Sequence, residues 1–300
     1  MDEPLRLMCV LAHPDDESLA VGGTLAMYAA NGVETSLLMA TRGECGWAGE
    51  AAANPGPREL GRIREAELRA ATWALGIRNL VFLNQMDGAL GQSDPAMVIA
   101  RIVAEIRRLR PHVVVTFGPD GLYGHPDHIA ISQLTTAAVV GAAAPAFDEL
   151  GDRRSHQVDK LYYRVWTAAE GEIYRAVFGE LGIDVRGTRR EWVAWPDWSV
   201  TTRLDTAGYW SEVWEAASCH RSQLGNPARF AALSAQDHRR LWGTQQFYRV
   251  MSLVPGEAEV EDDLFAGIRS RARHSYPGFA ASNGATSANA TMVVRQGSAA

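Results

Sequence analysis

Two short segments of the sequence combine histidine and aspartate at a spacing that suits metal chemistry. The first reads His13-Pro-Asp-Asp-Glu17 and the second reads His125-Pro-Asp-His128. Imidazole nitrogens and carboxylate oxygens are ligands of Zn²⁺ and of other divalent ions. A set of histidines and aspartate without cysteine leaves coordination positions open for water, which is typical of catalytic sites. If the fold brings both segments together, they predict a metal-dependent catalytic centre.

Each segment also has a simpler interpretation. Acidic residues in the first turn of a helix complement its dipole, and proline is common at the first helical position. One segment alone is therefore weak evidence for a metal site. The sequence has two His-Pro-Asp triplets, each with a further potential ligand within three residues. This repetition favours a shared metal site.

The elements around these segments alternate between strands and helices over the first 140 residues. Strands are expected at 5–12, 34–40, 79–83 and 112–117, and helices at 18–30, 57–75, 95–109 and 126–140. Parallel strands need long crossovers, which are helical here, so we expect a Rossmann-like α/β fold with a mostly parallel sheet flanked by helices. Ligands bind at the carboxyl ends of such strands. Both His-Pro-Asp segments follow a strand, at that edge.

The pattern weakens after residue 150. A strand at 161–166, a helix at 206–219 and a strand at 247–253 predict a smaller C-terminal α+β portion. We interpret residues 1–276 as a single domain. Residues 277–300 are too small and too polar to pack, so we expect a disordered tail there.

Composition excludes several functional classes. The 29 basic and 35 acidic residues give a net charge of -6 without a basic block, which disfavours binding to nucleic acid or anionic lipid. The three cysteines (Cys9, Cys45 and Cys219) form no CxxC pair, so neither a disulfide framework nor a thiolate zinc site is expected. No apolar stretch reaches the roughly 18 residues of a membrane span. We expect a cytoplasmic protein without membrane insertion, and leave a homo-oligomeric state open.

The paired segments resemble the signature of the LmbE/PIG-L family of metal-dependent N-acetylglucosaminyl deacetylases. The resemblance extends from about Leu5 to Ile131 and is weaker beyond residue 150. It includes Thr41-Arg-Gly-Glu44, Arg64-Glu-Ala-Glu-Leu68 and Asp87-Gly88, and a weaker match at His220-Arg-Ser-Gln223.

The resemblance implies the metal ligands and the base. His13, Asp16 and His128 resemble the three ligands of a zinc ion, with another divalent ion such as Fe²⁺ as an alternative. Asp15 resembles the general base that takes a proton from the attacking water.

Three more residues resemble groups that act on the tetrahedral oxyanion. His125 resembles an imidazole that stabilises this oxyanion in its cationic form, and Asp127 is expected to orient the His125 ring. Tyr123 is expected to donate a hydroxyl hydrogen bond to the same oxygen. With Asp15 deprotonated and His125 protonated in the active form, the expected pH profile is bell-shaped.

Four residues are expected to bind the substrate. They are Arg64, Asp87, Glu44 and His220. The alternative for Arg64 is an internal salt bridge with Glu67 or Glu44, and the alternative for His220 is an exposed helical histidine. Cys45 departs from the family pattern next to Glu44, which leaves the group attached to the sugar undefined.

The resemblance therefore implies a zinc-dependent hydrolase that removes the N-acetyl group from a small glycoside containing N-acetylglucosamine or from a related metabolite. The nearest alternative is a metal-dependent amidase acting on sugar-thiol conjugates. A dinucleotide-dependent oxidoreductase is disfavoured because the first strand-to-helix turn lacks G-x-G-x-x-G and carries carboxylates that repel a pyrophosphate. A sugar-binding module without activity is a further alternative, although all catalytic positions are intact.

Overall fold

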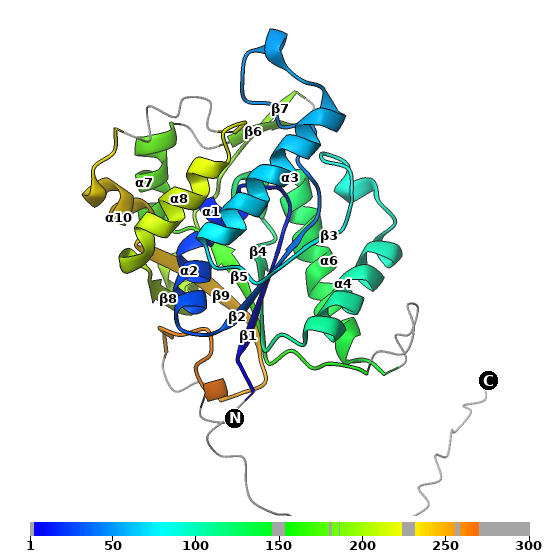
Figure 1. Cartoon of the computed structure of the whole chain (residues 1–300). Helices are drawn as coiled ribbons and strands as arrows, with labels where there is room; N and C mark the ends of the chain where they lie inside the picture. The colour runs from blue at the N-terminus through cyan, green and yellow to red at the C-terminus, as the bar shows by residue number, and fades with distance from the viewer. Residues whose placement is uncertain are drawn as a thin grey trace, which may run out of the picture.

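The computed structural model describes residues 3–145, 154–179, 182–185, 187–223, 232–255 and 259–269. The tail predicted at 277–300 lies outside these ranges. A seven-stranded sheet in the order β3-β2-β1-β4-β5-β9-β8 forms the centre of the molecule (Figure 1). Its strands are β1 (Arg6–Leu11), β2 (Glu34–Met39), β3 (Asn79–Phe82), β4 (Val113–Phe117), β5 (Lys160–Val165), β8 (Thr202–Asp205) and β9 (Thr244–Ser252).

The first five strands are parallel, and β1 lies between β2 and β4. The strands β1 and β4 consist almost entirely of buried apolar residues because helices cover both faces of a parallel sheet. The condition for a shared site, that the first and fourth strands are neighbours, is therefore met. The expected Rossmann-like fold class is confirmed.

Helices form a layer on each face of the sheet. In Figure 1, α4 and α6 lie on one face and α2, α3 and α8 on the other. The described helices are α1 (Asp16–Leu19), α2 (Gly22–Ala30), α3 (Pro57–Ala74), α4 (Pro95–Leu109), α5 (Gly121–Gly124), α6 (Pro126–Ala143), α7 (Ala168–Phe178), α8 (Trp210–Cys219) and α10 (Ala235–Trp242). Short 3₁₀ turns lie at Ala51–Ala53, Leu90–Gln92, Asp197–Ser199 and Ala207–Tyr209. No described helix has the length and apolarity that a membrane crossing requires.

The helix expected at 18–30 is broken into α1 and α2. The carbonyl oxygen of Ala20 accepts a hydrogen bond from Arg164 Nε at 2.7 Å, and that of Leu19 accepts one from the Tyr174 hydroxyl at 2.8 Å. The two side chains thus donate hydrogen bonds to the backbone carbonyl oxygens at the end of α1. A Cβ at Gly23 would lie 2.7 Å from Thr206, so α2 packs against the C-terminal portion at a distance that only glycine allows.

The C-terminal portion continues the same sheet and adds a separate hairpin. Strand β9 is antiparallel to both β5 and β8, whereas β6 (Gly182–Val185) and β7 (Thr188–Glu191) pair with each other. The α+β character expected here is confirmed. The elements β6, β7, β8, α7 and α10 were not predicted, and the helix expected from residue 206 begins at Trp210 after a 3₁₀ turn.

Candidate metal and catalytic site

The two His-Pro-Asp segments meet at the carboxyl edge of the sheet. His13 follows β1, whereas His125 and His128 flank the start of α6, shortly after the neighbouring strand β4. The ring centroids of His13 and His125 are 4.6 Å apart, and those of His13 and His128 are 5.2 Å apart. Phe117, the last residue of β4, stacks on the His128 ring at 4.1 Å and fixes its plane.

The side chains of His13, Asp16 and His128 form a triangle in this cluster, called the triangle below. His13 Nδ1 lies 3.2 Å from His128 Nε2, which lies 3.4 Å from Asp16 Oδ1. His13 Nδ1 is 3.8 Å from the other oxygen of Asp16. Ligands held about 2.0–2.1 Å from a tetrahedral zinc ion are about 3.3 Å from one another. The three side chains are buried, and the His13–His128 and His128–Asp16 contacts have this spacing, whereas the His13–Asp16 contact is longer.

The opposite nitrogen of His13 faces two carboxylates. His13 Nε2 lies 3.1 Å from Asp87 Oδ1 and 3.3 Å from Asp127 Oδ2. Burial lowers the pKa of His13, but Asp127 and Asp87 outweigh it and raise the pKa to about 10. The Nε2 proton is donated to these carboxylates, so a cation bound in the triangle would displace the other proton, the one on Nδ1, and use the Nδ1 lone pair. This carboxylate-histidine arrangement is typical of metal-ligating histidines.

Backbone amides hold both carboxylates in place. Asp127 accepts hydrogen bonds from Gly88 N at 2.7 Å and Leu90 N at 3.1 Å, and Asp87 accepts one from Cys45 N at 2.9 Å. Asp127 was expected to orient His125, and Asp87 to contact substrate. The structure places both carboxylates against His13, and Asp127 contacts His125 through its backbone N–H. Contact of Asp87 with substrate stays a prediction.

His125 has the opposite proton arrangement. It caps α6, and its Nδ1 accepts the backbone N–H of Asp127 at 3.1 Å, so the neutral ring carries its proton on Nε2. Burial, together with the nearby His13, lowers the pKa of His125 to about 4. The cationic form expected from the sequence is therefore disfavoured. Tyr123 packs edge-on against His128, and burial, followed by the charge of Asp16, raises its pKa, which keeps the hydroxyl protonated.

Asp15 lies beside the triangle in a strained conformation. Its φ of 116° is uncommon for any residue with a Cβ. Its carboxylate is 3.2 Å from Arg64 Nη2 and is 22% exposed. Burial raises the pKa of Asp15, although Arg64 acts in the opposite direction. Of the two neighbouring aspartates, Asp16 joins the triangle and Asp15 contacts Arg64.

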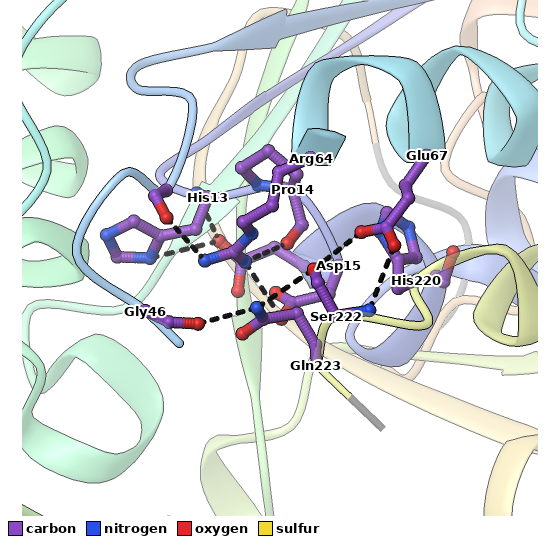
Figure 2. A network of polar contacts seen from close by, with 12 residues as sticks. His13, Pro14, Asp15, Gly46, Arg64, Glu67, His220, Ser222 and Gln223 are labelled. Carbon is purple, nitrogen blue, oxygen red and sulfur yellow. Dashed lines mark hydrogen bonds and ion pairs between the residues drawn. The ribbon is translucent and has the colours of Figure 1, made fainter. Parts of the chain in front are cut away.

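Arg64 is buried in the floor of the site. Its guanidinium donates to the carbonyl oxygens of Gly43, at 2.9 Å, and Pro14 (Figure 2). A Cβ at Gly43, which has a φ of 68°, would lie 2.3 Å from this guanidinium. Arg64 was expected either to contact substrate or to pair with Glu67 or Glu44. Its carboxylate partner is Asp15, and it connects the loop after β1 to the loop after β2. Contact of Arg64 with substrate stays a prediction.

The other expected substrate contacts differ in exposure. Glu44 is half-buried and accepts the backbone N–H of Arg42 at 3.3 Å. His220 is 1% exposed, and its Nε2 lies 2.6 Å from Glu17 Oε1. His220 is therefore buried and paired inside the protein. Both alternatives expected for it, an exposed helical histidine and a contact with substrate, differ from this observation. No role was predicted for Glu17, although it belongs to the first His-Pro-Asp segment.

Comparisons with known proteins agree with this fold. Residues 8–139 match the family model described as PIG-L, GlcNAc-PI de-N-acetylase. A 1D-myo-inositol 2-acetamido-2-deoxy-alpha-D-glucopyranoside deacetylase from Rhodococcus jostii is 36% identical, over 88% of this chain and 98% of that protein. A conserved protein from Thermus thermophilus superposes with a TM-score of 0.59 at 26% identity, covering 84% of this chain and 97% of the other.

The fold is shared more widely. The N,N'-diacetylchitobiose deacetylase from Pyrococcus horikoshii superposes with a TM-score of 0.62 at 19% identity, over 82% of this chain and 83% of that one. Fold, site and relatives together define an amide hydrolase of the deacetylase class. The chain belongs to the PIG-L (LmbE) family. The N-deacetylase expected from the sequence is confirmed at this level.

Proposed function

We propose that the protein removes the acetyl group from the N-acetylglucosamine unit of a small glycoside, with an inositol as the group attached to the sugar. The observation that carries this proposal is the triangle of His13, Asp16 and His128 with Asp15 beside it. The names of the relatives, which specify a 2-acetamido-2-deoxyglucoside of inositol, support the choice of substrate.

The donor set fits a resident divalent ion. His13 Nδ1, His128 Nε2 and the Asp16 carboxylate would hold it, and the carboxylates of Asp87 and Asp127 favour positive charge nearby. We propose zinc, with Fe²⁺ as the alternative, because imidazole and carboxylate suit both. When bound, such an ion polarises the amide carbonyl and lowers the pKa of water.

The side chains around the triangle have the remaining catalytic roles. Asp15, oriented by Arg64, takes the proton from the attacking water and returns it to the departing amine. The Nε2–H of neutral His125 and the hydroxyl of Tyr123 donate hydrogen bonds to the oxygen of the tetrahedral intermediate. Asp127 and Asp87 keep His13 in the tautomer that a ligand needs. In this scheme His125 stabilises charge as a neutral donor.

Acetate release tests the proposal. Purified protein loaded with one divalent ion is incubated with N-acetylglucosaminyl-inositol, with free N-acetylglucosamine and with a cysteinyl amide of glucosaminyl-inositol. We expect acetate from the first substrate at a kcat/KM at least tenfold above that of the free sugar. Turnover of the cysteinyl amide alone would instead establish the sugar-thiol amidase. Cytoplasmic location and homo-oligomerisation stay predictions.

A further inference from the structure

We infer that Glu17 and His220 form a positioning pair that holds the backbone of Asp15 in its strained conformation. This inference rests on the proposed role of Asp15 as the base. According to this inference, the C-terminal portion of the chain, through His220, helps to position the catalytic base. His220 thereby has a function other than the expected contact with substrate.

The first step is the hydrogen bond that supports the strained residue. Asp15 has φ 116° and ψ -29°, and its backbone N–H donates to Glu17 Oε2 at 3.0 Å. The turn at Asp15 directs its carboxylate to Arg64 while Asp16 enters the triangle. Strain of this kind persists only where the surroundings enforce it. Glu17 supplies an acceptor at the strained residue itself.

The second step is that Glu17 is itself fixed. Its side chain is 0% exposed, and Oε1 accepts the Ser18 hydroxyl at 2.6 Å and contacts His220 Nε2 at 2.6 Å. A buried carboxylate requires hydrogen-bonding or charged partners, and these contacts provide them. Each oxygen of Glu17 thus has a separate task. One accepts the amide of Asp15 and the other is held by Ser18 and His220.

The third step is that His220 is held by elements outside the catalytic loop. It follows α8, which packs against α1, α2 and α3. In the same turn, Ser222 donates from both its backbone N and its hydroxyl to Glu67 of α3, at 2.9 and 2.6 Å. Gln223 Nε2 donates to the Gly46 carbonyl at 2.6 Å (Figure 2). The position of His220 is therefore set by α3 and by the loop after β2.

This arrangement makes a specific kinetic prediction. A positioning pair acts through the base, so its loss lowers kcat while KM and metal content stay as in the parent enzyme. We expect His220→Ala to lower kcat about 10- to 100-fold, the usual effect of misplacing a catalytic group. We expect His220→Gln, which retains a donor towards Glu17, to recover most of this loss. His156→Gln, which replaces another buried histidine that contacts the Pro111 carbonyl before β4, at the opposite end of the sheet from the site, is the matched control and leaves kcat unchanged.

The decisive measurement combines kinetics with amide exchange. In an Asp15→Asn background, His220→Ala is expected to cause no further loss. Hydrogen exchange at the Asp15 amide is expected to be slow in the parent and at least tenfold faster in Glu17→Ala and His220→Ala. A rise in KM alone, or unchanged exchange in both variants, would overturn the inference. If the parent releases no acetate the proposed function fails, while the exchange data still decide whether the pair supports Asp15.

Discussion

The histidines of the site differ in what their second nitrogen contacts. His13 donates Nε2–H to carboxylates and turns Nδ1 towards the triangle, whereas His125 accepts a backbone amide N–H at Nδ1 and carries its own N–H at Nε2. One ring is thereby prepared to ligate a cation and the other to donate to an oxyanion. The neighbours of each ring therefore set its tautomer, and the tautomer decides which histidine can ligate a cation and which can donate a hydrogen bond. The residue type alone does not distinguish these two roles.

Replacing Asp15 by Asn tests the base at this scale. The amide keeps the size of the side chain and a contact with Arg64 but cannot take a proton. We expect kcat to fall by about 10²–10⁴, the contribution of general base catalysis. Metal stoichiometry, measured by elemental analysis, should equal that of the parent. Turnover unchanged within twofold would exclude Asp15 as the base.

The pH profile tests the protonation states of Asp15 and His125. Burial raises the pKa of Asp15, and the active form is deprotonated, so kcat/KM should fall as the pH drops through a pKa above the usual value of about 3.9. The pKa of His125 is about 4, so this ring is already neutral near pH 7 and its titration adds no alkaline limb. We expect a single acid limb in place of the bell shape. An alkaline limb that disappears in His125→Gln would show that a cationic ring is required.

At the scale of elements, Asp127 connects the start of α6 to the loop after β3 and to the histidine after β1. Its two oxygens accept Gly88 N and Leu90 N, and Oδ2 also faces His13. One carboxylate thus joins the carboxyl ends of three strands. The triangle depends on this junction because it fixes the ring of His13.

Asp127→Asn tests the junction. The substitution removes a negative charge beside His13 and places an N–H₂ group where one of the oxygens now accepts. We expect metal affinity to fall about 10- to 100-fold, measured by competition with a chromophoric chelator. Asp94→Asn is the matched control, because Asp94 caps the exposed start of α4 and asparagine caps equally well. Equal affinities in the two variants would contradict the role assigned to Asp127.

Sequence reasoning succeeded for elements whose pattern is local. Buried parallel strands consist of apolar runs, so β1 and β4 were predicted nearly to their ends. It failed where distant side chains decide the structure. The break after α1 depends on Arg164, which follows 144 residues after Ala20, and the burial of His220 depends on Glu17, 203 residues earlier. Asp87 and Asp127 were recognised as site residues, but their contact with His13 required the fold.

At the scale of the whole molecule, a buried network of charged side chains connects residues 259–269, the last described segment, to the sheet. Glu261 is 2% exposed and accepts Lys160 Nζ of β5 at 2.8 Å and the Tyr162 hydroxyl at 2.6 Å. Its backbone also pairs with Thr201 and Arg203 beside β8. The network joins strands β5 and β8 to residues 259–269 without contacting the triangle.

Removing one partner of this network separates global stability from catalysis. Glu261→Gln leaves the fully buried Lys160 without its counter-charge, which costs about 3–5 kcal/mol of unfolding free energy. The double variant Lys160→Met with Glu261→Leu removes both fully buried charges, whereas Arg249, whose Nη1 lies 2.6 Å from Glu261, is 24% exposed and keeps contact with water. Replacing a buried ion pair by apolar residues of similar volume is often neutral or stabilising. We therefore expect the single variant to unfold at much lower urea concentration than the double variant. Metal affinity and kcat of the folded protein should be unchanged in both, because the network lies away from His13 and Asp15. A single variant as stable as the parent would show that Lys160 does not need Glu261 to remain charged inside the fold.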